Sequence, residues 1–346
     1  RIQQMNDLKN INGGGYASPN YYEEINIIRG IALILVLLGH SFPDGDTGPA
    51  ILSAAWMRRF LYTFHMGVFF AISGFVMSAR LYKGNYDLKL EIGKKARRLL
   101  IPYLFYSFLT IGPKILLSKY VNNPVEPDSI WMIFLGRSPN GGMWFLWHLF
   151  FVSAFCLIVM WISRNRTTQE KTIIMVAIGI TGYFLYLINM FEIINYSLEF
   201  SFFFAVGVLL NRYYNVALPK FSMGLGLGVL VINMIVSCPL LSLRINKLYA
   251  FTGILGIYAI FSIAIKVVRE SNRIRKILDD LGSNSYAIYL LSYFGQIPMR
   301  ILFYSKLQAP YWICVASMFV GGILLPMVAI RLIRKNKLFR AIALGE

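Results

Sequence analysis

Long stretches of apolar residues alternate with short polar segments along most of the chain. Residues 31–38 and 202–210, for example, contain only apolar side chains and glycine. A transmembrane β-strand alternates polar and apolar positions, whereas a helix that crosses about 30 Å of hydrocarbon needs roughly 20 predominantly apolar residues. The pattern therefore predicts an all-α fold, a polytopic transmembrane helical bundle.

The apolar stretches predict ten membrane-spanning helices joined by short polar loops. We expect them near residues 25–42, 60–81, 98–118, 143–163, 172–190, 194–211, 221–240, 248–268, 284–304 and 310–332. Residues 1–20 are polar, rich in Gly and Asn, and lack the apolar core of a signal peptide, so we expect a disordered N-terminal segment. Residues 21–346 would then form one integral-membrane domain.

Basic residues are concentrated in every second loop. The loop after the second span contains Arg80, Lys83, Lys89, Lys94, Lys95, Arg97 and Arg98. The loops after the fourth, sixth and eighth spans and the C-terminal tail are also basic. Because cytoplasmic loops are enriched in Lys and Arg, this alternation predicts an even number of spans with the N- and C-termini both in the cytoplasm. It also accounts for the formal net charge of +18 without a nucleic-acid partner.

The overall composition agrees with a membrane location. The chain is 57% hydrophobic and 14% charged, against about 45–50% and 25% in soluble domains. Cys156, Cys238 and Cys314 all lie within apolar runs, and an odd number of buried thiols supports neither a disulfide framework nor a metal cluster. We therefore expect no bound metal and no tightly bound cofactor.

Arg29 and His40 lie at opposite ends of the first predicted span, eleven positions apart. Eleven residues make about three helical turns, so both side chains should project from one face, roughly 16 Å apart along the axis. Such a face would present a cation near the cytoplasm and a titratable imidazole deeper in the bundle. Spacing alone leaves a second interpretation open, in which Arg29 anchors the helix end and His40 is interfacial. Asp44 and Asp46, just beyond, either position His40 or form an ordinary turn.

Five segments, in a consistent order along most of the chain, carry a family resemblance. They are NIIRGIALILVLLGHSF with Arg29 and His40, FHMGVFFAISGFVMSARL with Ser73, KKARRLLIPYLFYS with Arg97 and Arg98, MWFLWHLFF with Trp144, and LGSNSYAIYLL with Tyr289. Together they resemble the family-three integral-membrane acyltransferases, whose usual core also has ten spans.

The resemblance implies an enzyme that transfers an acyl group, usually acetyl from acetyl-CoA, to a hydroxyl of a sugar or cell-surface polysaccharide. Other acyl-CoA donors stay open. The resemblance makes His40 the general base, an effect commonly worth about 10²–10⁴ in rate, and places Arg29 beside the entering donor. The protein would then work in a bacterial plasma membrane, with the lipid bilayer, an acyl-CoA and a sugar or glycan acceptor as partners.

The basic segment that opens the third span would bind the donor phosphates at the cytoplasmic face. The resemblance implies donor contacts from this segment and from the second span, at Arg97, Arg98, Lys94, Lys95 and Ser73. The forked donors of an Arg guanidinium suit a phosphate group. A charge block that only sets topology is the alternative, because the loop pattern requires positive charge here.

Three further residues are candidates for acceptor binding or for assisting His40. His65 would orient the acceptor, or else form a hydrogen bond in helix packing, the role that we favour for His148. Trp144 belongs to the motif of the fourth span. Glu199 is an ionisable residue within a predicted span. Because a charge inside the membrane is costly, such a residue indicates a functional role. The alternative is that Glu199 lies at the membrane interface.

A transporter or flippase for polysaccharides or small molecules is the alternative from a different class. Many spans that contain Arg, His and Glu also describe substrate and proton pathways. The sequence shows no convincing pair of broken helices and no two-fold internal repeat, which would be expected of many transporters. We therefore favour the acyltransferase.

Overall fold

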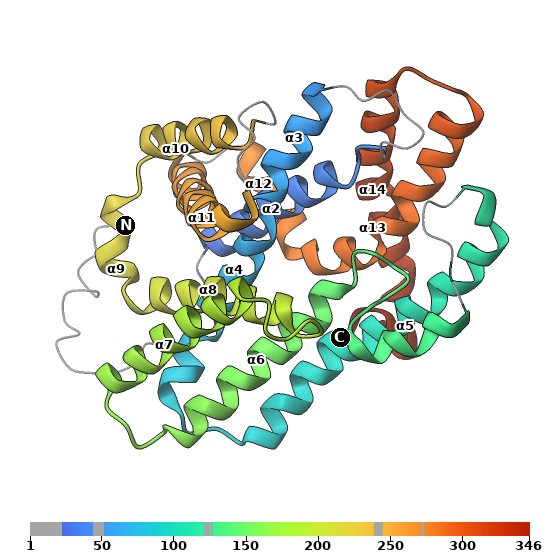
Figure 1. The fold of residues 1–346 in the computed structure, drawn as a ribbon. Coiled ribbons are helices and arrows are strands. Elements are labelled where there is room, and N and C mark those ends of the chain that lie inside the picture. Colours follow the sequence, from blue (N-terminus) through green and yellow to red (C-terminus); the bar gives the residue numbers. More distant parts are fainter. Residues whose placement is uncertain (1–22, 44–51, 121–124, 126, 239–244, 271–272) are drawn as a thin grey trace.

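The computed structural model describes residues 23–43, 52–120, 125, 127–238, 245–270 and 273–346. Every secondary-structure element in these ranges is helical, which confirms the all-α prediction for the described part of the chain (Figure 1). The N-terminal segment 1–20, and Asp44 and Asp46 after the first span, lie outside the described residues.

The longer helices fall into two consecutive groups. The group that ends at Arg212 comprises α2 (Glu23–Gly39), α3 (Leu52–Tyr62), α4 (His65–Lys83), α5 (Leu88–Leu116), α6 (Trp144–Ile162), α7 (Thr168–Leu187) and α8 (Asn195–Arg212). The group after it comprises α10 (Met223–Val236), α11 (Ile245–Glu270), α12 (Arg273–Ser283), α13 (Ser285–Met299), α14 (Tyr311–Ile333) and α15 (Lys337–Leu344). The shorter elements are η2 (Ser118–Tyr120), η3 (Pro127–Leu135), α9 (Tyr214–Ala217), η4 (Leu218–Lys220) and the π-helix η6 (Arg300–Lys306).

Each of the ten predicted spans overlaps at least one helix of the described residues, although the second is divided between α3 and α4 and the ninth between α13 and η6. In the described ranges, six helical segments are long and apolar enough to cross a membrane, and a seventh qualifies if residues 214–220 and α10, bent by 82°, count as one span. The remaining predicted spans are α2, α8 and α13, with 17, 18 and 15 residues. The helices are thus those of a multi-pass membrane protein, and the number ten stays a prediction.

The second predicted span is not one continuous helix. The chain breaks after Tyr62, and α4 begins at His65. The Thr63 hydroxyl stabilises the break, because it donates to the Phe60 carbonyl oxygen at 2.6 Å and lies 3.3 Å from Asn233 Oδ1. The break therefore needs neither Pro nor Gly, the residues that usually mark one.

Residues 273–283 form the amphipathic helix α12, where the sequence predicted only a basic loop. This helix packs on α2 at very short range. A Cβ on Gly30 would lie 2.3 Å from the Leu278 carbonyl oxygen, and one on Gly282 would lie 1.9 Å from that of Asn26. Only glycine allows such an approach of two backbones. It holds α2 in the interior of the bundle, where α2 also packs against α4, α11 and α13 (Figure 1).

Basic helix termini gather at one end of the bundle, which we call the basic end. Lys171, at the start of α7, is buried and donates from Nζ to the carbonyl oxygens of Tyr82 at 2.9 Å and Arg164 at 3.0 Å. Arg334, at the end of α14, donates to Asn284 Oδ1 at 2.8 Å. The first turn of α2 lies next to the junction of α12 and α13 at this same end. The helix therefore starts at the basic end and finishes at the opposite one.

Candidate active site

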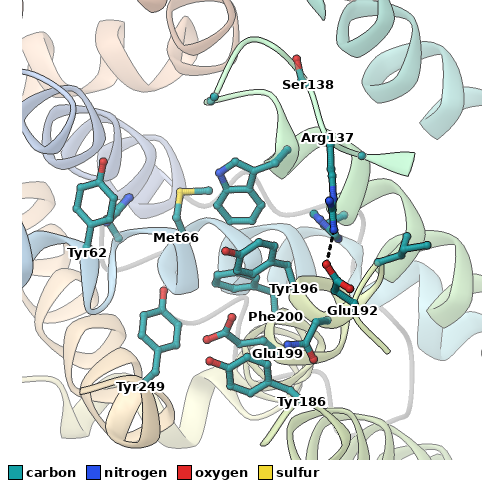
Figure 2. A pocket seen from close by; sticks show the side chains of 18 of the residues that line it. Tyr62, Met66, Arg137, Ser138, Tyr186, Glu192, Tyr196, Glu199, Phe200 and Tyr249 are labelled. Atoms are coloured by element: carbon teal, nitrogen blue, oxygen red, sulfur yellow. Dashed lines mark hydrogen bonds and ion pairs between the residues drawn. The ribbon is translucent and has the colours of Figure 1, made fainter. Parts of the chain in front are cut away.

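A large pocket of about 1360 Å³ lies at the end of the bundle opposite the basic end. We call it the His40 pocket. It is lined by the end of α2, the α3–α4 break, the loop of residues 135–142, and parts of α6, α7, α8, α11 and α13. Figure 2 shows side chains from these separate elements converging on one space. Helices that are distant in sequence thus contribute to a single site.

His40 directly follows α2 and is exposed in this pocket. Its backbone N–H still bonds to the Val36 carbonyl oxygen at 3.0 Å, so the imidazole is placed by the last helical turn. The Tyr62 hydroxyl lies 3.1 Å from His40 Nδ1. A partner on one ring nitrogen fixes the orientation of the ring.

His65 is the second imidazole of the His40 pocket, and it is almost fully buried. Its Nδ1 lies 2.6 Å from the Leu61 carbonyl oxygen. Because a carbonyl oxygen can only accept, Nδ1 carries a proton, and Nε2 of the neutral ring is an acceptor. The Tyr62 ring lies between the two histidines, with ring centroids 5.7 Å from His40 and 4.9 Å from His65. The α3–α4 break thereby brings both imidazoles to one tyrosine.

Aromatic side chains form the wall opposite the histidines. The Trp144 ring lies 5.0 Å from that of Tyr196 and 5.5 Å from that of Phe200, measured between centroids. Glu199 is buried within this wall, with only 5% of its surface exposed. Its carboxylate lies beside the Tyr186 hydroxyl (Figure 2). The wall therefore combines flat apolar faces with one buried acidic group.

Two other features of the His40 pocket concern polar side chains near its rim. Arg137, in the loop of residues 135–142, forms an ion pair with Glu192 (Figure 2). His148 Nδ1 lies 2.8 Å from the Ser197 hydroxyl, which joins α6 to α8. That contact agrees with the packing role expected of His148, although His148 also lines the pocket.

A second pocket, of about 240 Å³, lies nearer the basic end. We call it the Arg29 pocket. Arg29, Lys95 and Arg98 line it together with Ser73. The Arg29 guanidinium donates to Asn26 Oδ1 at 3.4 Å. Three cations and a hydroxyl from α2, α4 and α5 thus share one small cavity.

Lys94 and Arg97 lie on another face of α5, away from the Arg29 pocket. They line a shallow groove at the start of α5. Lys94 Nζ pairs with Glu91 at 2.9 Å, and Arg97 donates to the Glu346 carbonyl oxygen at 3.2 Å. The structure therefore divides the basic segment that the sequence treats as one donor site.

The two pockets bring together most of the candidate residues. His40, His65, Trp144 and Glu199 share the His40 pocket, whereas Arg29, Ser73 and Arg98 share the Arg29 pocket. Met66 and Tyr289 line both pockets, so the pockets adjoin there.

Sequence reasoning missed Tyr62, Met66 and Tyr186 as pocket residues. Tyr62 and Met66 flank His65 in the chain and could have been found from that proximity. Tyr186 lies in an apolar run with no charged or His neighbour, so nothing in the sequence marks it.

Two curated proteins are similar in sequence to part of this chain. Nodulation protein NolL of Mesorhizobium japonicum is 28% identical over 145 residues, which cover 40% of this chain and 35% of that protein. NolL of Sinorhizobium fredii is 29% identical over 147 residues, which cover 42% of this chain and 37% of that protein. The chain thus spans about a third of the length of these curated relatives. No solved structure matches it significantly.

The family comparison covers far more of the chain. The family described as an acyltransferase domain matches residues 22–331, from the start of α2 almost to the end of α14. The expectation of an acyl-transferring enzyme is thereby confirmed at the level of the family. The chain belongs to the membrane acyltransferase family that its five motifs resemble.

Proposed function

We propose that the protein is a membrane O-acyltransferase that moves an acyl group, in the first place acetyl, from a cytoplasmic acyl-CoA to a hydroxyl of a sugar or cell-surface polysaccharide. The observation that carries the proposal is the pair of adjoining pockets. One pocket holds three cations, and the other holds three imidazoles and an aromatic wall. A phosphate-bearing thioester and a polar acceptor could therefore meet inside one bundle.

His40 acts as the general base in this proposal. Its neutral imidazole takes the proton of the acceptor hydroxyl while the oxygen attacks the thioester carbonyl carbon. The new C–O bond forms, the C–S bond breaks, and the imidazolium returns the proton to the departing CoA sulfur. Transfer of the proton by a positioned base is commonly worth about 10²–10⁴ in rate. The Tyr62 hydroxyl at 3.1 Å orients the ring for this task.

The Arg29 pocket serves the donor. Arg29, Lys95 and Arg98 supply positive charge for its phosphates, and Ser73 adds a hydroxyl. A volume of about 240 Å³ is too small for a whole nucleotide-bearing donor, since pockets for drug-sized ligands take about 300–1,000 Å³. The pocket therefore receives the narrow arm of the donor, and the nucleotide stays at the basic end.

The His40 pocket serves the acceptor. Its volume of about 1360 Å³ exceeds that usual range for a small ligand, which leaves room for more than one sugar unit. Trp144 and Tyr196 offer flat faces to sugar rings, and Glu199 accepts hydrogen bonds from hydroxyls. His65 lies close enough to His40 to assist it through Tyr62.

The experiment uses purified protein in lipid nanodiscs with radiolabelled acetyl-CoA. We expect release of CoA thiol, slow with water and faster with a membrane extract that contains surface glycans. His40→Ala should lower this release at least about 100-fold, while the thermal unfolding temperature stays unchanged because His40 is exposed. Unchanged release in His40→Ala would overturn the base assignment. Flux of a glycan across vesicles without consumption of acetyl-CoA would support the transporter instead.

A further inference from the structure

Two side chains separate the His40 pocket from the Arg29 pocket. Met66, in the first turn of α4, and Tyr289, in the second turn of α13, line both pockets. Both are nearly buried, with 7% and 8% of their surface exposed. They therefore form the partition between the cations of one pocket and the imidazoles of the other.

The Arg29 pocket follows one face of α4 up to this partition. It is lined from α4 by Met66, Phe69, Ile72, Ser73, Val76 and Met77, which recur at helical spacing. Eleven residues of α-helix extend roughly 16 Å, and Met77 lies toward the basic end. A narrow ligand that is inserted from the basic end would therefore reach the partition last.

The two sides of the partition differ in stiffness. The Tyr289 hydroxyl donates to the Gly142 carbonyl oxygen, in the loop that lines the His40 pocket. The Tyr289 ring also meets the Phe145 ring edge-on, with centroids 5.7 Å apart. Met66, by contrast, has an unbranched side chain with three rotatable bonds, which adapts to what it packs against. The partition thus has one fixed side and one adaptable side.

We propose that Met66 and Tyr289 form a gate through which the acyl group passes, and that this gate sets the largest acyl group that the protein transfers. The inference rests on the proposed function, because it takes the donor from the Arg29 pocket and the base from the His40 pocket. An acetyl group passes with a small displacement of Met66. Each further methylene has to displace more of a packed side chain, and pockets distinguish groups that differ by one methylene by about 10–200-fold.

The test compares acetyl-, propanoyl- and butanoyl-CoA as donors for the full chain in nanodiscs. Met66→Ala widens the gate, so the ratio of kcat/KM for butanoyl-CoA to that for acetyl-CoA should rise at least about tenfold. Met66→Phe narrows it, so the same ratio should fall. Met77→Ala is the matched control, because Met77 is a buried methionine of the same helix that lines only the Arg29 pocket. Its ratio should stay near that of the unsubstituted protein.

The outcomes separate the gate from the proposed function. If the unsubstituted protein transfers acetyl through His40 but neither Met66 variant changes the donor ratio, only the gate is overturned. An equal change in Met66→Ala and Met77→Ala would also overturn it, because selection would then occur along the whole pocket. If the unsubstituted protein consumes no acyl-CoA, the proposed function and the gate fail together. If Met66→Ala does not fold, the test rests on Met66→Phe. A lower ratio of kcat/KM for butanoyl-CoA to that for acetyl-CoA then supports the gate, and an unchanged or higher ratio overturns it.

Discussion

Arg97 and Arg98 are adjacent in the sequence, yet the helix turns successive side chains about 100° apart. Arg98 lines the Arg29 pocket, with its guanidinium carbon 5.2 Å from the centroid of the Tyr286 ring. Arg97 lines the separate groove and contacts Glu346. The two residues thus form a matched pair with equal charge on one helix but in different surroundings. They can distinguish donor binding from a charge block that only sets topology.

Arg98→Gln should raise the KM for acetyl-CoA at least about tenfold, because a hydrogen bond between charged groups contributes about 1.5–3 kcal/mol. Arg97→Gln should leave that KM near its original value. Steady-state kinetics of both variants in nanodiscs would measure the difference. Equal increases in the two variants would mean that the general positive potential attracts the donor. No increase in either variant would leave this segment with a topological role alone.

The crossing of α4 and α8 explains one of the sequence motifs at the scale of the element. A Cβ on Gly74, in the Ser-Gly-Phe segment of α4, would lie 2.0 Å from the Phe204 carbonyl oxygen. On α8, a Cβ on Gly207 would lie 1.8 Å from the carbonyl oxygen of Ala71. Both helices therefore need glycine where their backbones meet. This crossing fixes the relative position of the first turns of α4 and α8, which line the His40 pocket.

Gly74→Ala should destabilise the protein by about 1–3 kcal/mol, because the added methyl group forces two packed backbones apart. Thermal unfolding in detergent would show this as a lower transition temperature. Gly228→Ala on α10 is the matched control, since a Cβ there meets nothing within 4 Å. It should be neutral or slightly stabilising, because Ala favours the helix more than Gly does. A transition temperature of Gly74→Ala equal to that of the control would contradict the close crossing.

The sequence predicts the helices well and their interruptions poorly. Apolar length is a local property, so every predicted span overlaps at least one helix. The break between Tyr62 and His65 depends on a hydrogen bond from Thr63 to its own turn and on a contact with Asn233, which is 170 positions away. Helix α12 is too polar to resemble a span, and it is stabilised by packing on α2 rather than by its own apolar length.

The assembly of the site also depends on contacts between distant parts of the chain, which local sequence patterns do not predict. Arg29 lies in α2 and His40 directly follows it, so their spacing predicted that both side chains would project from one face, while it left the interfacial interpretation of His40 open. The presence of Glu199 and His65 in one pocket depends on how α8 crosses α4, which spacing within either helix does not specify. The division of the basic segment between two faces of α5 likewise follows from which face packs inward.

Three shorter helices among the predicted spans line the two pockets. The predicted spans that do not qualify as membrane-crossing on their own, α2, α8 and α13, supply His40, Glu199 and Tyr289 to the pockets. Helices that line a polar cavity need less apolar surface than helices that face lipid. A count based on apolar length leaves these three helices out. Ten spans, with the basic end in the cytoplasm and the His40 pocket facing outward, stay a prediction from the loop charges.

Cysteine labelling can test this polarity at the two ends of one helix, α7. In a variant without the three native cysteines, Ile188→Cys introduces an exposed thiol at the end of α7 near the His40 pocket, and Arg166→Cys introduces one at the basic end. A membrane-impermeant maleimide added to intact cells should label the thiol at position 188 and not the one at 166, because the loop charges predict that the basic end lies in the cytoplasm. Permeabilised cells should give both signals. Labelling of position 166 alone would reverse the orientation and place the histidines inside the cell, and labelling of both in intact cells would contradict a membrane-spanning α7.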